Sequence, residues 1–168
     1  MNLIVNAKDI SLTLGDITYP CRIGREGFIT QDKGREGDWK TPLGTYAVRY
    51  GFYRADRVPA PLSLLTFHAL KPDDGWCDAP QDIAYNMPVR LPYPSSTEKM
   101  WKEGGVYDII IVLGHNDDPP AAGLGSAIFL HIARIDDRAT AGCIAVSPDV
   151  MAVLLPRLTT LSEVIIQA

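Results

Sequence analysis

The segment Thr140-Ala141-Gly142-Cys143-Ile144-Ala145-Val146-Ser147-Pro148-Asp149 decides the fold, because it joins a tight turn directly to a helix start. The glycine before the cysteine lets the backbone bend sharply and leaves room beside it. Ser147 is a favourable N-cap, Pro148 suits the first helical position, and Asp149 is an acid in the first turn. The pattern predicts one late helix, which ends near Pro156–Leu158.

Cys143 is a candidate nucleophile, since a small-Gly-Cys turn that leaves a strand is a good mount for a reactive thiol. A cysteine attacks as its thiolate, and a nearby histidine both accepts the proton and stabilises the charge. His131 ends the apolar run Ala127–Leu130 and is predicted to emerge at the mouth of a strand. If the two form an ion pair, the pKa of the thiol lies below its usual value of about 8.5. The alternatives are a small buried cysteine and a core histidine bonded to a carbonyl.

Three stretches surround this pair in a specific order: Gly37-Asp38-Trp39-Lys40-Thr41-Pro42-Leu43-Gly44-Thr45-Tyr46, Gly125-Ser126-Ala127-Ile128-Phe129-Leu130-His131 and Gly142-Cys143-Ile144. Together they resemble the L,D-transpeptidase catalytic-domain family (YkuD-like). The resemblance extends over most of the chain, roughly from Ile23 to Ala168. It implies a mainly β, sandwich-like fold with one late α-helix and a cleft between sheet and loop.

The resemblance also implies an acyl-enzyme mechanism in which His131 deprotonates Cys143. Backbone N–H groups of Gly142 and Cys143 are the expected oxyanion donors. The residue after the histidine, Ile132, has no polar side chain, so a backbone carbonyl here or nearby must orient the imidazole. By family analogy, the bond attacked precedes the terminal D-Ala of a peptidoglycan stem tetrapeptide.

Two positions depart from the family pattern, which usually has histidine before Gly-Cys and arginine two places after the cysteine. These positions are Ala141 and Ala145 here, which affects substrate binding rather than acyl chemistry. Arg134 is expected to compensate by binding a substrate carboxylate. The other candidate substrate-binding residues are Thr140, His115, Asn116 and Arg138. For Arg138 a solvated loop, and for His115 and Asn116 a structural turn, are equally acceptable interpretations.

Length and composition suit one domain covering residues 1–168. The net charge of −4 argues against nucleic acid or an anionic membrane as a partner, because both require a basic face. Cys21, Cys77 and Cys143 are too few and too irregularly spaced for a disulfide framework, which favours a reducing compartment.

A metal site is a weak alternative for the chemical residues. Zinc would accept His115, Asp117, His131 and Cys143 as ligands, but no closely spaced pair of ligands supports such a site. We therefore expect neither a metal nor another cofactor.

The first nine residues, Met1–Asp9, contain no basic region, and Asn6 and Lys8 interrupt their apolar run. They are expected to form a strand rather than a signal peptide or a membrane span. This favours a cytoplasmic location, with a periplasmic one if a leader has been removed.

Short alternating or β-branched runs predict strands. These runs are Leu3–Val5, Asp9–Leu14, Ile17–Ile23, Gly44–Tyr50, Asp108–Leu113 and Ser162–Gln167. The proline-rich stretch Lys71–Tyr107 is predicted to be a long irregular loop, with a helical turn over Ser95–Glu103 that Glu98 helps to cap. Four aromatic residues of this loop either wall a groove or anchor the loop to the sheet: Trp76, Tyr85, Tyr93 and Trp101.

Three functions are consistent with these features. The favoured one is an L,D-carboxypeptidase that trims tetrapeptides to tripeptides in murein recycling, with stem peptides or muropeptides as partners. The second is an L,D-transpeptidase that forms cross-links or exchanges D-amino acids. The third belongs to a different class and is an inactive peptide-binding module.

Overall fold

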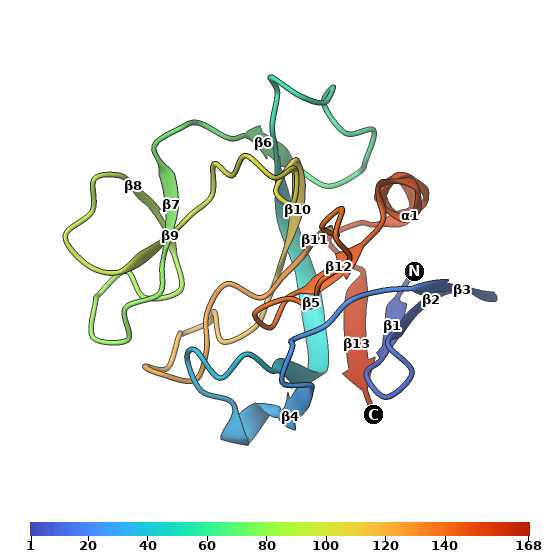
Figure 1. The fold of residues 1–168 in the computed structure, drawn as a ribbon, viewed down its shortest axis with the longest axis horizontal. Coiled ribbons are helices and arrows are strands. Elements are labelled where there is room, and N and C mark those ends of the chain that lie inside the picture. The colour runs from blue at the N-terminus through green and yellow to red at the C-terminus, as the bar shows by residue number, and fades with distance from the viewer.

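A long strand, β5 (Thr41–Tyr53), lies at the centre of the computed structural model, which describes residues 1–168 (Figure 1). Its first half pairs with β13 (Glu163–Gln167) and its second half with β10 (Ile109–Leu113), both antiparallel. β5 thereby joins two halves of one ten-stranded sheet, whose order is β12-β11-β10-β5-β13-β1-β2-β3, with β4 and β6 also paired to β5. The remaining strands are β1 (Leu3–Asn6), β2 (Ser11–Leu14), β3 (Ile17–Pro20), β4 (Phe28–Thr30), β6 (Phe67–Ala69), β11 (Phe129–Ile132) and β12 (Ile144–Val146).

The two ends of this strand order meet, so the sheet curls around its core. Just after β3, the Arg22 N–H donates to the Ala145 carbonyl of β12 at 2.7 Å, and the Ala145 N–H donates back at 2.9 Å. The predicted mainly β class with one late helix is confirmed. The two layers of the sandwich-like fold are parts of one curved sheet.

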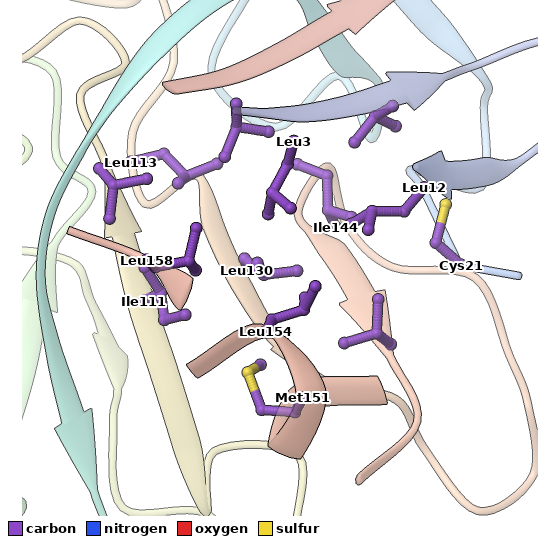
Figure 2. Packing of buried hydrophobic residues seen from close by; sticks show 14 of the residues in the cluster. Leu3, Leu12, Cys21, Ile111, Leu113, Leu130, Ile144, Met151, Leu154 and Leu158 are labelled. Atoms are coloured by element: carbon purple, nitrogen blue, oxygen red, sulfur yellow. The ribbon is translucent and has the colours of Figure 1, made fainter. Parts of the chain in front are cut away.

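Strand alternation separates the core from the face that carries the chemical residues. Leu130 and Ile144 point into the main hydrophobic core, while His131 and Cys143 belong to the opposite face. Figure 2 shows the core packing of Leu3, Leu12, Cys21, Ile111, Leu113, Leu130, Ile144, Met151, Leu154 and Leu158.

The predicted helix is α1 (Pro148–Leu154), followed by a short 3-10 turn over Leu155–Arg157. Its N-cap forms as expected, because the Ser147 Oγ accepts the Val150 N–H at 3.3 Å. The helix covers the core with Met151 and its neighbours. No helix in the structure has the length and apolarity that crossing a membrane requires.

The strands predicted at Leu3–Val5, Asp108–Leu113 and Ser162–Gln167 are present within one residue at each end. The strand expected over Asp9–Leu14 begins only at Ser11, because the Asn6 side chain accepts the N–H groups of the next turn. Two further predicted strands have other bounds, and one short element was not predicted. The strand predicted over Ile17–Ile23 ends at Pro20, that over Gly44–Tyr50 extends to Thr41–Tyr53, and a 3-10 turn covers Gln31–Lys33.

The stretch Lys71–Tyr107 is not the irregular loop that was predicted. It forms a separate three-stranded antiparallel sheet in the order β8-β7-β9, seen in green beside the main sheet in Figure 1. Its strands are β7 (Asp74–Cys77), β8 (Pro88–Arg90) and β9 (Thr97–Lys99). The predicted helical turn over Ser95–Glu103 is wrong, because Thr97–Lys99 pairs along its length with β7.

The aromatic residues Trp76, Tyr85 and Trp101 of this stretch anchor it within the fold. Trp76 and Tyr85 are buried, and the Trp76 Nε1–H donates to Asn86 Oδ1 at 3.0 Å. The Arg54 guanidinium lies 3.5 Å from the centroid of the Trp101 ring. Trp76 also lines a second pocket of about 320 Å³, so the groove interpretation holds for this side chain.

Candidate active site

Parallel pairing of β11 with β12 brings the two predicted catalytic residues to one face. The register places Leu130 opposite Ile144 and His131 opposite Ala145, so Cys143 lies just before the paired segment. His131 and Cys143 both line a cleft of about 500 Å³. Other side chains around the cleft are Glu36, Trp39, Asp78, Glu98, Lys102, Tyr107, Ser126, Arg134, Arg138, Thr140, Ala141 and Ala145.

His131 is held by the backbone of its own strand. Its Nδ1 lies 2.8 Å from the Ile132 carbonyl oxygen, and a carbonyl only accepts, so Nδ1 carries the proton and Nε2 has the free lone pair. The side chain is 7% exposed, and this burial lowers the pKa of His131 to about 4. The edge of the ring packs against Tyr107 at a centroid distance of 5.2 Å. The predicted backbone carbonyl is thus that of Ile132.

The Cys143 thiol is buried and protonated in the structure. Its S–H donates to the Ala127 carbonyl at 3.1 Å, while the Phe129 N–H donates to Sγ at 3.4 Å. Burial raises the pKa of Cys143 to about 12, and the negative charge of Glu98 adds to the effect. The raised pKa of Cys143 and the lowered pKa of His131 both favour a neutral pair over a thiolate–imidazolium ion pair in the substrate-free molecule.

Thr140 shapes the turn that presents the cysteine. Its Oγ1 accepts the Gly142 N–H at 3.1 Å and donates to the Cys143 carbonyl at 2.6 Å. The Gly142 N–H is thus occupied, which corrects its predicted role as an oxyanion donor. The Cys143 N–H makes no hydrogen bond within the chain and is the donor that remains. Thr140 lines the cleft as predicted, and its hydroxyl is committed to this turn.

The conformation of Gly142 explains why the turn requires glycine. Its φ is 141°, and a Cβ at this position would lie 2.9 Å from the Lys40 carbonyl oxygen. The Thr41 hydroxyl donates to the Gly142 carbonyl and accepts the Gly24 N–H, each at 2.8 Å. The motif at residues 37–46 therefore supports the cysteine turn through Thr41. This role of Thr41 was not predicted from the sequence, although Thr41 belongs to the Thr-Pro pair of the quoted motif.

Comparison with known proteins agrees with this geometry. The model of the L,D-transpeptidase catalytic domain (YkuD) matches residues 7–166. The chain belongs to this family. Among solved structures, Bd1075 of Bdellovibrio bacteriovorus matches with a TM-score of 0.45 and 16% sequence identity, over 99% of this chain and 47% of that one. The chain thus spans about half the length of Bd1075, and no curated protein matches it.

The YkuD cleft contains a charged group that sequence reasoning missed. Lys102 Nζ donates to Glu98 Oε1 at 2.6 Å and lies 4.2 Å from the centroid of the Tyr107 ring. The Tyr107 hydroxyl donates to the same carboxylate oxygen at 2.6 Å. The four-residue spacing of Glu98 and Lys102 is the local signal, and Glu98 is considered in the sequence analysis only as a helix cap. Lys102 keeps two N–H donors that no protein group accepts.

Arg134 and Arg138 also line the cleft, but the carboxylate of Asp136 forms ion pairs with both guanidinium groups. Arg134 Nε and Nη2 donate to the two Asp136 oxygens at 2.9 and 3.0 Å. Arg138 Nε lies 3.1 Å from Asp136 Oδ2. All three side chains are substantially exposed, so these pairs contribute little to stability. Binding of a substrate carboxylate by Arg134 or Arg138 stays a prediction. It requires the substrate carboxylate to replace Asp136 as the partner of the guanidinium.

His115 and Asn116 lie outside the cleft that contains Cys143. His115 is 3% exposed and borders an adjoining pocket of about 40 Å³. The Asn116 side chain bonds the backbone of Ala121 and Gly125, so the structural-turn interpretation holds for it. Asp117 pairs with Arg49 Nε at 2.8 Å. The four residues considered for zinc are not brought together, and no group of His, Cys, Asp or Glu side chains is placed to hold a metal ion.

Proposed function

We propose that this protein is an L,D-carboxypeptidase that removes the terminal D-Ala from peptidoglycan stem tetrapeptides and releases the tripeptide. The observation that carries the proposal is the arrangement of Cys143 and His131 in one cleft, with the imidazole fixed by the Ile132 carbonyl. Family membership supports the choice of peptidoglycan peptides as the substrate class.

In the acylation step, Cys143 Sγ attacks the carbonyl carbon before D-Ala as His131 Nε2 takes the thiol proton. Because both groups rest in their neutral forms, the proton moves together with the attack instead of before it. The Cys143 N–H donates to the oxyanion that forms. When the tetrahedral intermediate collapses, the C–N bond breaks and His131 returns the proton to the amine of the departing D-Ala.

In the second step, water attacks the thioester and gives its proton to His131. The C–S bond breaks, the tripeptide leaves with a new carboxylate, and the thiol regains a proton from His131. The same histidine therefore acts as base and then as acid in each half of the cycle. This requires an imidazole that changes charge without changing position, which the Ile132 carbonyl provides.

The carboxylate of D-Ala needs a cation, and Lys102 is the group that we assign to it. Family members usually carry an arginine two places after the cysteine, but Ala145 occupies this position. Lys102 lines the cleft together with His131 and keeps two N–H donors beyond its bond to one Glu98 oxygen, whereas both oxygens of Asp136 hold the Arg134 guanidinium. An ammonium is suited to a single carboxylate as a compact point charge.

Two small side chains beside the Cys143 thiol favour hydrolysis of the thioester over its transfer to an acceptor amine. Ala141 and Ala145 border the cleft where the family usually has histidine and arginine. Fewer groups are thus present to hold an acceptor strand, whereas water needs no such site. Cleavage without cross-linking suits the recycling of peptidoglycan fragments in the cytoplasm, which is the setting we propose.

Mass spectrometry of products from a purified disaccharide-tetrapeptide tests this function, with and without an added D-amino acid. We expect tripeptide and free D-Ala as the main products, and a thioester-linked intermediate on Cys143 in rapidly quenched samples. A predominance of cross-linked dimers or exchanged tetrapeptides would establish the transpeptidase instead. Binding without any turnover would establish the inactive module.

A further inference from the structure

The end of the cleft that adjoins the small pocket contains hydrogen-bonding atoms without partners. Ser126 is only 8% exposed, and its Oγ makes no hydrogen bond. The Asp78 Oδ1 atom is also buried without a partner. Both side chains line the cleft, and Ser126 lines the small pocket as well. Buried polar atoms almost always have a hydrogen-bond partner, so these two atoms indicate a partner that is not part of the chain, such as a bound ligand.

Glu36 belongs to the same end of the cleft. The Tyr85 hydroxyl donates to Glu36 Oε2 at 2.6 Å and accepts the Gly125 N–H at 3.1 Å, which ties Glu36 to the turn that carries Ser126. Asp78 and Glu36 both line this cleft. No ion pair in the structure includes either carboxylate.

Two carboxylates without an ion-pair partner and a free hydroxyl call for a cation with several hydrogen-bond donors. A primary ammonium presents three N–H donors and matches three separate oxygen acceptors. A metal ion fits less well, since the structure contains no group of His, Cys, Asp and Glu side chains placed for one. The chemistry of this site therefore favours an ammonium group.

We infer that Asp78, Glu36 and Ser126 bind the side-chain ammonium of the diamino acid residue whose carbonyl Cys143 attacks. The inference rests on the proposed function for the identity of the peptide. Ser126 directly precedes Ala127, whose carbonyl accepts the Cys143 thiol, so the site begins beside the nucleophile. A diamino acid side chain extends away from the attacked carbonyl, and the three acceptors line the same cleft as Cys143.

Calorimetric binding to the Cys143→Ala protein tests the site without turnover. The probes are a stem tetrapeptide with a free side-chain amine and the same peptide acetylated on that amine. We expect acetylation to weaken binding by about 10- to 100-fold, in line with the loss of charge-assisted hydrogen bonds. Adding Asp78→Asn or Glu36→Gln should remove most of this difference. Glu26→Gln, a change of an exposed acid that does not line the cleft, should retain it.

The outcomes of these experiments distinguish failure of the ammonium site from failure of the proposed carboxypeptidase activity. Equal binding of the two peptides, no binding of either, or full discrimination in both Asp78→Asn and Glu36→Gln overturns the ammonium site. Wild-type enzyme that releases D-Ala from both peptides at equal rates also overturns it, while leaving the carboxypeptidase intact. Selective binding of the free amine without any D-Ala release supports the site and overturns the proposed function.

Discussion

The Nδ1 atom of His131 lies 2.8 Å from the carbonyl oxygen of Ile132, the next residue in the same strand. A backbone acceptor fixes the tautomer and the ring orientation as a carboxylate would, but it adds no negative charge. Burial can therefore keep the imidazole neutral, and its pKa falls to about 4. The general base is thus available over the whole neutral range.

Replacement of Cys143 by alanine should lower D-Ala release by about a thousandfold or more, because no other group in the cleft can form the thioester. The fold should persist, since the change removes one small side chain. A coupled assay for free D-Ala and a thermal melt measure the two effects. Cys77→Ala and Cys21→Ala are the matched controls and should remain active. Wild-type turnover in Cys143→Ala would refute the mechanism.

The neutral state of His131 should make stability depend on pH. Its pKa is lowered from 6.5 to about 4 in the folded protein, so the unfolded chain binds more protons between these values. The free energy of unfolding contributed by His131 is complete above pH 6.5 and declines by about 3 kcal/mol as the pH falls to 4. Denaturant unfolding at several pH values measures this slope. A His131→Gln variant with the same slope as wild type would contradict the assignment.

Thr140→Val should lower kcat by about 10- to 100-fold, because the Gly142 N–H and the Cys143 carbonyl both lose their partner. Thr140→Ser keeps the hydroxyl and should restore most of the activity. Steady-state kinetics on the tetrapeptide distinguish the two variants. If valine and serine gave the same rate, the hydroxyl would have no part in holding the turn.

Lys102→Met should raise KM for the tetrapeptide by about tenfold while changing turnover of the D-alaninamide analogue little, since that analogue has no terminal carboxylate. Arg134→Met should have a smaller effect, because both Asp136 oxygens hold the guanidinium, whereas a single Glu98 oxygen holds Lys102. The ratio of kcat/KM for acid over amide measures carboxylate recognition in each protein. A ratio reduced by Arg134→Met and not by Lys102→Met would assign the role to Arg134.

Gly142→Ala should destabilise the protein by about 1–3 kcal/mol and abolish most activity, because its φ of 141° is poorly accessible to alanine. The added Cβ would also meet the Lys40 carbonyl oxygen at 2.9 Å. Chemical denaturation and D-Ala release measure the two consequences. Gly15→Ala, at a turn with free space around the added Cβ, is the control for backbone strain without a clash.

The amino-acid sequence by itself determined those local elements whose sequence pattern spans only a few residues. Ser147-Pro148-Asp149 specifies the helix start. His131 and Cys143 were identifiable as a pair from their motifs. The three strands of residues 74–99 were not, because they are short and stable only when paired with one another.

Tertiary structure alone decided the state and the surroundings of the catalytic pair. Burial, which no local pattern reports, makes the Cys143 thiol and the His131 imidazole neutral instead of ionised. Lys102 and Asp78 follow strands β9 and β7 of the small sheet, and they reach the cleft beside the cysteine turn only through folding. Short-range sequence fixes where the chain bends, whereas charge and access depend on what long-range packing places around each group.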